Sequence, residues 1–283
     1  MTDNVQEHHG YLEGVGRLRI HYRTWEVARP VAGIIVVHGI GEHIGRYEEF
    51  AGTMAGYRIS TFGLDLRGHG VSEGRRGHVA SFNVLLQDLD RFRREVQGLV
   101  DMSCPLFILG HSMGGLIVTR YLEEYDSGLL GGIIMSPWLA TAMETPRWKV
   151  TLATTLNRFL PAFPFRTRLD AALLSHDAGE VTRYEEDPLV HDHITPRLFS
   201  EMSTAMGLAL QRSERLNVPL LFLLSGADQL VDTDKAVAFA RSLQALDVTV
   251  RVIPDAFHEL LHEENRAERY AEIREWITKH LPD

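Results

Sequence analysis

Short apolar runs that alternate with segments of helical periodicity constrain the fold of this chain more than any other feature. Ala32–Val37 and Pro105–Leu109 carry no charge, which is typical of strands buried on both faces. Further strands are expected at Arg17–Val27, Tyr57–Leu66, Leu129–Met135, Pro219–Leu224 and Val248–Ile253. The expected helices are Tyr47–Ala55, Phe82–Val100, Gly115–Tyr125, Thr233–Leu246 and Glu263–His280. These repeated units predict an α/β fold, with a mostly parallel central sheet flanked by helices.

One region interrupts this alternation. Residues 138–217 contain no convincing strand, and several prolines divide the region into short helical pieces. Roughly 80 residues without a strand, between two buried strands, indicate an inserted subdomain. We therefore expect a core formed by residues 1–137 and 218–283, with a helical cap at 138–217.

The charge balance and the cysteine count exclude several classes of protein. The chain has 29 basic and 38 acidic residues, a formal net charge of −9, which argues against a nucleic-acid partner. A single cysteine, Cys104, excludes an internal disulfide and a cysteine-based zinc site.

Neither a leader nor a membrane span is expected. The polar segment Met1–Gly10 lacks the basic and apolar regions of a signal peptide. The longest stretch without a charge, Met102–Thr119, contains a proline and several glycines, as expected for a strand, a turn and a helix start. We expect a cytoplasmic protein, with at most transient, peripheral contact to a membrane surface.

The pentapeptide Gly110–Gly114 reads Gly-His-Ser-Met-Gly and stands between a predicted strand and a predicted helix. A serine on such a sharp turn exposes its hydroxyl above the sheet, and small flanking residues leave room for the turn. Ser112 is therefore the candidate nucleophile. The alternative is an ordinary surface serine in a glycine-rich turn.

A serine nucleophile requires a base and a carboxylate, which follow it along the chain in the order acid, then histidine. Asp228 follows the strand Pro219–Leu224, and His258 follows the strand Val248–Ile253, so both lie where active sites of α/β sheets form. Asp232 and Asp234 are competing acids, for which capping of the next helix is the simpler role.

Two backbone N–H groups are expected to form the oxyanion hole. One belongs to Met113, which directly follows the nucleophile. The other is expected in the loop after the strand Ala32–Val37, where Ile40 lies between Gly39 and Gly41.

Four motifs carry a family resemblance: His38–His43 with Arg46 and Tyr47, Asp65–Ser72, Gly110–Gly114, and Gly226–Asp228 with Phe257 and His258. Together they resemble α/β-hydrolases of the monoacylglycerol lipase and lysophospholipase group, over about residues 31–137 and 219–280. The resemblance implies a serine carboxylester hydrolase that needs no cofactor. It also suggests that Glu42 and Arg46 lie near the polar end of the substrate. A salt bridge between these two residues that braces the loop is an equally good interpretation.

A competing motif overlaps the candidate histidine. Residues His258–His262 read His-Glu-Leu-Leu-His, which on a helix would place two imidazoles on one face for zinc, with Glu259 as base. The motif directly follows a predicted strand, however, and no third ligand is evident. We therefore expect no metal.

The cap supplies the candidate residues for the acyl chain. Trp148, Leu152, Leu156 and Phe159 are spaced by four, four and three, which places them on one helical face. This face either packs the cap onto the core, or lines an acyl tunnel, or forms a patch that meets lipid.

These observations predict a serine carboxylester hydrolase acting on single-chain lipid esters, with monoacylglycerols as the expected substrates and an acyl-enzyme on Ser112. Lysophospholipase and general carboxylesterase activities are the alternatives. A proline iminopeptidase-type amide hydrolase would need a cap carboxylate, for which Glu144, Glu180, Glu185 and Glu186 are candidates. A ligand-binding protein without catalysis is disfavoured, because all three triad positions are filled. The sequence leaves the oligomeric state open.

Overall fold

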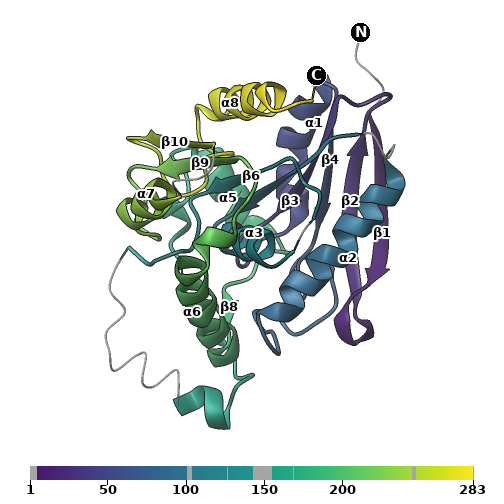
Figure 1. Ribbon diagram of the computed structural model, residues 1–283. Coiled ribbons are helices and arrows are strands. Elements are labelled where there is room, and N and C mark those ends of the chain that lie inside the picture. The colour runs from purple at the N-terminus through teal and green to yellow at the C-terminus, as the bar shows by residue number, and fades with distance from the viewer. Residues whose placement is uncertain are drawn as a thin grey trace.

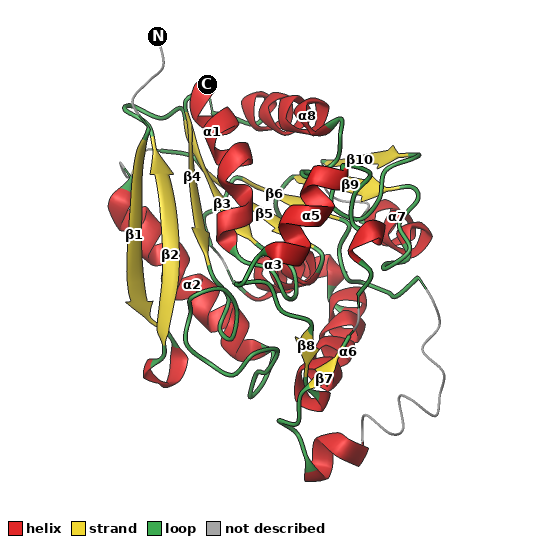
Figure 2. Cartoon of the chain, turned by 180° about the vertical axis from the view of Figure 1, so that it is seen from behind, coloured by secondary structure: helices red, strands yellow, loops and turns green. Residues whose placement is uncertain are grey.

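A central sheet of eight strands, flanked by helices on both faces, forms the body of the protein in a computed structural model (Figures 1 and 2). The structure describes residues 5–100, 104–125, 127–142, 155–167, 169–243 and 247–282. The strand order is β1-β2-β4-β3-β5-β6-β9-β10. The strands are β1 (Gln6–Glu13), β2 (Arg19–Glu26), β3 (Ala32–Val37), β4 (Ile59–Leu64), β5 (Leu106–His111), β6 (Gly131–Met135), β9 (Leu220–Ser225) and β10 (Val248–Ile253). β1 and β2 are antiparallel to their neighbours and the other pairs are parallel, so the predicted α/β-hydrolase architecture is confirmed.

Successive side chains of the inner strands pack alternately into two hydrophobic cores, one on each face of the sheet. In β3, Ile34 and Val36 pack with α1 (Glu48–Gly56) and α8 (Arg266–Lys279). Ile35 and Val37 pack on the opposite face. The helices on that face are α2 (Asn83–Leu99), α3 (Met113–Glu124) and α7 (Thr233–Ser242). The uncharged strand sequences thus follow from burial on both faces of the sheet.

The first strand is absent from the sequence-based expectations. β1 pairs with β2 along its whole length, with Gln6 opposite Glu26 and Glu13 opposite Arg19. Most of its side chains are exposed, so its sequence shows no apolar run or alternation. The expected strand at Arg17–Val27 corresponds to β2, and the further strand β1 forms the edge of the sheet.

The region between β6 and β9, where the cap is expected, contains two longer helices and two short strands. Its helices are α5 (Ala178–Glu186) and α6 (Pro196–Gln211), and residues 155–159 are also helical. Contrary to the expectation of no strand, β7 (Phe165–Arg166) and β8 (His193–Ile194) form a small antiparallel pair. Two residues per strand are too few for a periodic sequence signal. Short 3₁₀ turns complete the fold at Val15–Arg17, Ile44–Tyr47, Ala171–Leu173 and Ser213–Arg215.

None of the helices within the described ranges has the length and apolar character needed to cross a bilayer.

Candidate active site

Ser112 occupies a strained turn between β5 and α3. Its backbone has φ 53° and ψ −116°, a conformation that L-residues rarely adopt. A Cβ on Gly110 would lie 2.3 Å from the carbonyl oxygen of Gly114, and one on Gly114 would lie 2.0 Å from that of Val37. Both positions therefore require glycine, and the turn holds the Ser112 side chain above the end of the sheet.

Asp228 and His258 are brought together although 30 residues separate them. Nδ1 of His258 donates a 2.7 Å hydrogen bond to Oδ2 of Asp228, while Oδ1 accepts from the amides of Leu230 and Val231 at 2.8 and 3.0 Å. Burial alone would raise the pKa of Asp228, but the charge and hydrogen bond of His258 and the two amides hold it below its ordinary value. The carboxylate is thus ionised and fixes which imidazole nitrogen carries the proton.

The competing acid has the simpler role. Oδ1 of Asp232 accepts a hydrogen bond from the amide of Lys235 at 3.0 Å and caps the first turn of α7. Asp228 is therefore the carboxylate that contacts His258.

Ser112, His258 and Ile40 all line one cavity of about 220 Å³. The amide of Ile40 has no hydrogen-bond partner among the described residues, and the amide of Met113 begins α3, where no carbonyl precedes it in the helix. These are the two donors that an oxyanion hole requires beside Ser112. No hydrogen bond joins the side chains of Ser112 and His258, both of which are described, and catalytic contacts of this kind often tighten only when substrate binds.

The loop that carries Ile40 is held by the cap. Gly41 has φ +79°, and a Cβ there would lie 2.4 Å from the carbonyl oxygen of His191. The amide of His191 donates to the carbonyl oxygen of Gly41 at 2.8 Å, and Nε2 of its ring donates to that of Gly68 at 3.0 Å. This contact could not be predicted from the sequence, because it joins segments far apart in the chain.

The ring of His191 is partly buried, which makes this contact sensitive to acid. Burial lowers the pKa of His191 from 6.5 to about 4, and the ring lies 4.7 Å from that of His69, whose pKa is also held low by burial. Between these two pH values the unfolded chain binds more protons than the folded chain, so stability falls as the pH drops. The free energy of unfolding should fall by about 1 to 2 kcal/mol, less than a fully buried ring would give.

Thermal unfolding of His191→Gln should depend less on pH over this range. The control is His8→Gln, which replaces an exposed histidine of β1 and should retain the original slope. An unchanged slope in His191→Gln would contradict this assignment.

Glu42 is a buried carboxylate in the wall of the cavity. It accepts hydrogen bonds from the amide of Gly39 at 2.6 Å, the hydroxyl of Tyr47 at 3.1 Å and Nη1 of Arg46 at 3.1 Å. Burial alone would raise the pKa of Glu42, but the hydrogen bond to the ring of His111 and the charges of Arg46, His111 and His38 hold it well below its ordinary value. The salt bridge that would brace the loop is therefore present, and Glu42 also faces the space beside Ser112.

His111 connects this carboxylate to the catalytic loop, a role that the sequence did not predict. Its Nδ1 lies 3.1 Å from Oε1 of Glu42 and its Nε2 lies 3.3 Å from the carbonyl oxygen of His258. Burial opposes protonation, but the Glu42 hydrogen bond and charge raise the pKa of His111 on balance. With an acceptor at each nitrogen, the ring is suited to be a cation that holds the His258 backbone.

The His-Glu-Leu-Leu-His motif lies in turns before α8 and not on a helix. Both carboxylate oxygens of Glu259 accept from Arg46, at 2.6 and 2.7 Å, and Nε2 of His262 donates to the carbonyl oxygen of Arg46 at 3.0 Å. This arrangement lacks the helical spacing that the zinc hypothesis requires. Within the described ranges, no group of three or more potential ligands is placed to hold a metal ion.

The residues that line the cavity fall into two chemically different groups. Its polar wall combines carboxylate, imidazole and phenol groups, contributed by Glu42, His111, Tyr184 and Glu259. Its apolar wall is formed by Ile40, Trp138, Leu169, Leu174, Leu230 and Val231. Ser112 and His258 also line the cavity, so one bound molecule can contact both walls and the nucleophile.

The predicted acyl-contacting face of the cap is only partly described. Trp148 and Leu152 lie outside the described residues, and neither Leu156 nor Phe159 lines the cavity. Phe159 is 71% exposed, which fits the interpretation of this face as an exposed patch better than that of a tunnel wall. Helical spacing identifies residues that share a face, but not whether that face is directed at the core or at solvent.

Comparisons with known proteins agree with this geometry. The Hydrolase_4 family, described as serine aminopeptidase, S33, matches residues 28–265. The chain is 34% identical to human monoglyceride lipase, over 91% of this chain and 86% of the human protein. It is 29% identical to the monoacylglycerol lipase of Mycolicibacterium smegmatis, over 99% of this chain and 100% of the relative. The crystal structure of Paleococcus ferrophilus monoacylglycerol lipase superposes with a TM-score of 0.81 and 30% identity, covering 98% of this chain and 99% of that one. The chain therefore belongs to the Hydrolase_4 family and is an α/β-hydrolase of the monoacylglycerol lipase group, as the sequence motifs predicted.

Proposed function

We propose that this protein hydrolyses single-chain lipid esters, above all monoacylglycerols, through an acyl-enzyme on Ser112. The observation that carries the proposal is the cavity whose lining combines Ser112 and His258 with a polar and an apolar group of residues. A monoacylglycerol has the matching division, with two free hydroxyls at one end and one hydrocarbon chain at the other. The likeness to human monoglyceride lipase supports the same substrate class.

In the acylation step, His258 removes the proton of the Ser112 hydroxyl as its oxygen attacks the ester carbonyl. The amides of Ile40 and Met113 donate hydrogen bonds to the oxyanion that forms. Asp228 stabilises the imidazolium of His258, which then transfers its proton to the leaving alcohol oxygen. The carbon–oxygen bond of the ester breaks, the alcohol leaves, and the acyl group remains on Ser112.

Water completes the cycle. His258 accepts a proton from a water molecule that attacks the acyl carbonyl, and the same two amides hold the second oxyanion. The proton returns to Ser112 as the acyl–oxygen bond breaks, and a fatty acid is released. His258 carries out every proton transfer in these reaction steps, so the proposed mechanism requires no cofactor.

The polar wall suits a glycerol leaving group better than a free amine. Both of its carboxylates are already engaged, Glu42 by Arg46 and His111, and Glu259 by Arg46. Such occupied carboxylates accept hydrogen bonds from substrate hydroxyls but lack the unpaired charge that holds an ammonium group. Among the cap carboxylates that an iminopeptidase would need, Glu180, Glu185 and Glu186 do not line the cavity, and Glu144 lies outside the described residues.

A series of esters tests the proposal. Each methylene that enters the apolar part of the site contributes up to about 0.8 kcal/mol, so kcat/KM should rise several-fold per two carbons from acetate to medium chains. Monoacylglycerols should be hydrolysed faster than triacylglycerols, because the space beside Ser112 suits one chain. The measurement is kcat/KM for 4-nitrophenyl esters and acylglycerols of increasing chain length, with proline anilides and lysophospholipids included.

A profile that peaks at acetate and falls with each added carbon would contradict the proposal. Faster cleavage of proline anilides than of any ester would favour the amide hydrolase instead.

Exposed apolar side chains on the cap support contact with lipid aggregates. Phe159, Leu160, Phe163 and Phe165 are between 39% and 71% exposed and lie close together in the chain, with the rings of Phe163 and Phe165 5.3 Å apart. We call these four residues the cap patch. Exposed apolar residues gathered in this way mark interaction surfaces.

Replacement of Phe159 and Phe163 by serine should reduce binding to phosphatidylcholine vesicles, and hydrolysis of monoacylglycerol within them, several-fold. Hydrolysis of a soluble short-chain ester should not change, because neither residue lines the cavity. Leu210→Ser is the matched control, since Leu210 is also 52% exposed but lies near the far end of α6, about 20 Å along its axis from the end next to Pro161. Equal losses in the control and in the patch variant would contradict a specific role for the patch.

A further inference from the structure

β10 is the last strand of the sheet and pairs on one side only, with β9. The carbonyl oxygens of Asp247 and Ile253 accept from the amides of Leu220 and Gly226, which fixes the alternation along the strand. In a parallel pair, every second residue directs both its N–H and its C=O toward the neighbouring strand. Val248, Val250 and Val252 therefore direct their backbone groups outward, away from β9.

The sequence of this edge offers little protection against pairing. β10 contains three valines and an isoleucine, no proline and a single charge, Arg251, and Val252 is 44% exposed. Edge strands of monomeric proteins are commonly protected by charges, proline or a covering element. β1, at the other edge of the same sheet, begins with the exposed polar run Gln6–His9. The two edges thus differ in character, and β10 is the one suited to accept another strand.

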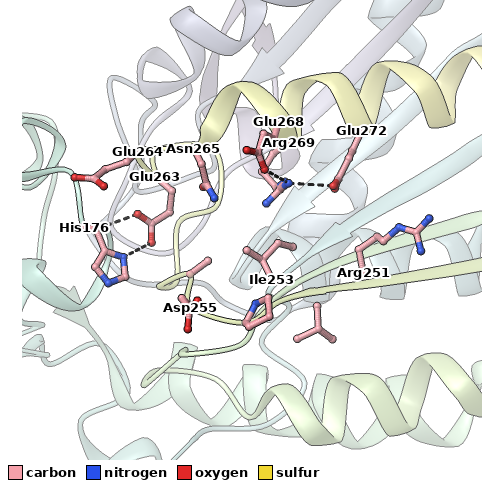
Figure 3. Close-up of a pocket in the computed structure, with 13 residues that line it drawn as sticks. His176, Arg251, Ile253, Asp255, Glu263, Glu264, Asn265, Glu268, Arg269 and Glu272 are labelled. Atoms are coloured by element: carbon pink, nitrogen blue, oxygen red, sulfur yellow. Dashed lines mark hydrogen bonds and ion pairs between the residues drawn. The ribbon is translucent and has the colours of Figure 1, made fainter.

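The charge beside β10 indicates which strand it accepts. Arg251 is exposed and makes no ion pair or hydrogen bond with any residue that the structure describes. It lines a cavity of about 570 Å³ between β10 and α8, together with Glu268 and Glu272 (Figure 3). Glu275 follows Glu272 by three positions and so shares its face of α8. Arg269 binds Glu268 and Glu272 at 2.9 and 3.0 Å, as Figure 3 shows, and Glu275 lies 3.5 Å from Arg274 at a largely exposed position. Arg251, which has no partner among the described residues, therefore lies next to a helix whose outermost carboxylate, Glu275, has only this loose contact.

The direction of α8 shows which position of β10 lies beside Glu275. α8 runs antiparallel to β10, because Lys279 and His280 at its end bind the Asp247 carboxylate at the start of the strand, at 3.3 and 3.1 Å. Thr249 lies about 6.6 Å beyond Asp247 along the strand. The same distance along α8, measured back from Lys279, corresponds to about four residues. Thr249 is therefore level with Glu275, whose side chain is 69% exposed.

We propose that β10 is a dimerisation edge, at which two copies of this chain pair their β10 strands antiparallel around a two-fold axis at Val250. In this register Val250 faces Val250 of the partner subunit, and Val248 faces Val252 of the partner subunit. All three outward residues then form hydrogen-bonded pairs, with about six hydrogen bonds in total. The two sheets become one continuous sheet.

This register also pairs the charges. Arg251 lies opposite Thr249 of the partner subunit, on the α8 side of the sheet, and is therefore level with Glu275 of the partner subunit. The symmetry axis repeats the Arg251–Glu275 pair, and it keeps the two arginines apart. A self-complementary surface of this kind is what an isologous interface requires, which is why we assign a second copy as the occupant.

Sedimentation velocity of the full-length protein, at concentrations up to about 0.1 mM, measures the proposed dimer directly. Val250→Pro should raise the dimer dissociation constant at least about 100-fold, because it removes the central outward N–H while the bonds to β9 remain. Val250→Thr keeps the N–H and the branched shape and is the matched control, which should remain dimeric. Ester hydrolysis should be unchanged in both, since neither touches the cavity beside Ser112.

A charge exchange gives an independent result, even if the proline variant fails to fold. Arg251→Glu and Glu275→Arg should each weaken the dimer about tenfold, and the double variant should recover most of the loss. Wild-type protein that sediments as a monomer over the whole concentration range would overturn the proposal. So would a double variant as weak as the sum of the two single changes, because it would show that the two side chains do not meet.

Discussion

Replacement of Ser112 by alanine is expected to lower kcat for ester hydrolysis by at least about 10⁴-fold. Among the described residues, three hydroxyl-bearing side chains line the cavity, those of Ser112, Thr167 and Tyr184. Ser112 is the one that stands at the end of a strand of the central sheet. Loss of the nucleophile leaves only substrate binding and oxyanion stabilisation, which account for a small residual rate. The measurement is the steady-state hydrolysis of a medium-chain ester by purified wild-type and variant proteins.

The fold should survive this change. Ser112 contributes its strained backbone to the turn, and alanine adopts this conformation at a similar cost. Thermal unfolding and circular dichroism of the variant therefore serve as the control. Retention of more than about a tenth of the wild-type rate would show that another residue is the nucleophile.

Replacement of Asp228 by asparagine is expected to lower kcat by about 10³- to 10⁴-fold. The asparagine amide can donate to Nδ1 of His258, which would place the proton on Nε2 and leave the ring unable to accept the Ser112 proton. The lost carboxylate also no longer stabilises the imidazolium. Steady-state kinetics on the same ester measure the loss.

Asp232→Asn is the matched control for Asp228→Asn. Its carboxylate caps α7 through the amide of Lys235, and asparagine is an equally good cap, so its activity should remain within about twofold of wild type. If Asp232→Asn lost more activity than Asp228→Asn, the assignment of the acid would be wrong.

The sequence predicted the parts of the site that lie at strand ends. Ser112, Asp228 and His258 each follow a strand that is recognisable from its apolar run, and parallel strands bring their carboxyl ends to one edge of the sheet. The choice of Asp228 over Asp232 used the same reasoning, and the 2.7 Å contact with His258 agrees with it.

The polar wall of the cavity could not be predicted, because its contacts join distant segments. Arg46 and Glu259 are 213 residues apart, and His111 and Glu42 are 69 apart. Each residue alone resembles an ordinary charged or turn residue in the sequence. Only the folded chain shows that Glu42 and His111 form a buried pair connected to the backbone of His258.

The edges of the sheet and the cap were least predictable for a different reason. β1 is paired through its backbone while most of its side chains face solvent, so its sequence resembles a loop. In the cap, the 71% exposure of Phe159 depends on how the helix lies against the core, which its periodicity does not specify. Periodicity predicts elements that bury a face and says little about elements that do not.

Covalent labelling tests the central claim most directly. The protein is incubated with a long-chain alkyl fluorophosphonate, whose phosphorus is attacked by an activated serine, and the adduct is located by mass spectrometry of the peptides. We expect one adduct on Ser112, none in Ser112→Ala, and a loss of monoacylglycerol hydrolysis in proportion to the fraction labelled. Full activity in completely labelled protein, or an adduct on another residue that abolishes activity, would contradict the central claim.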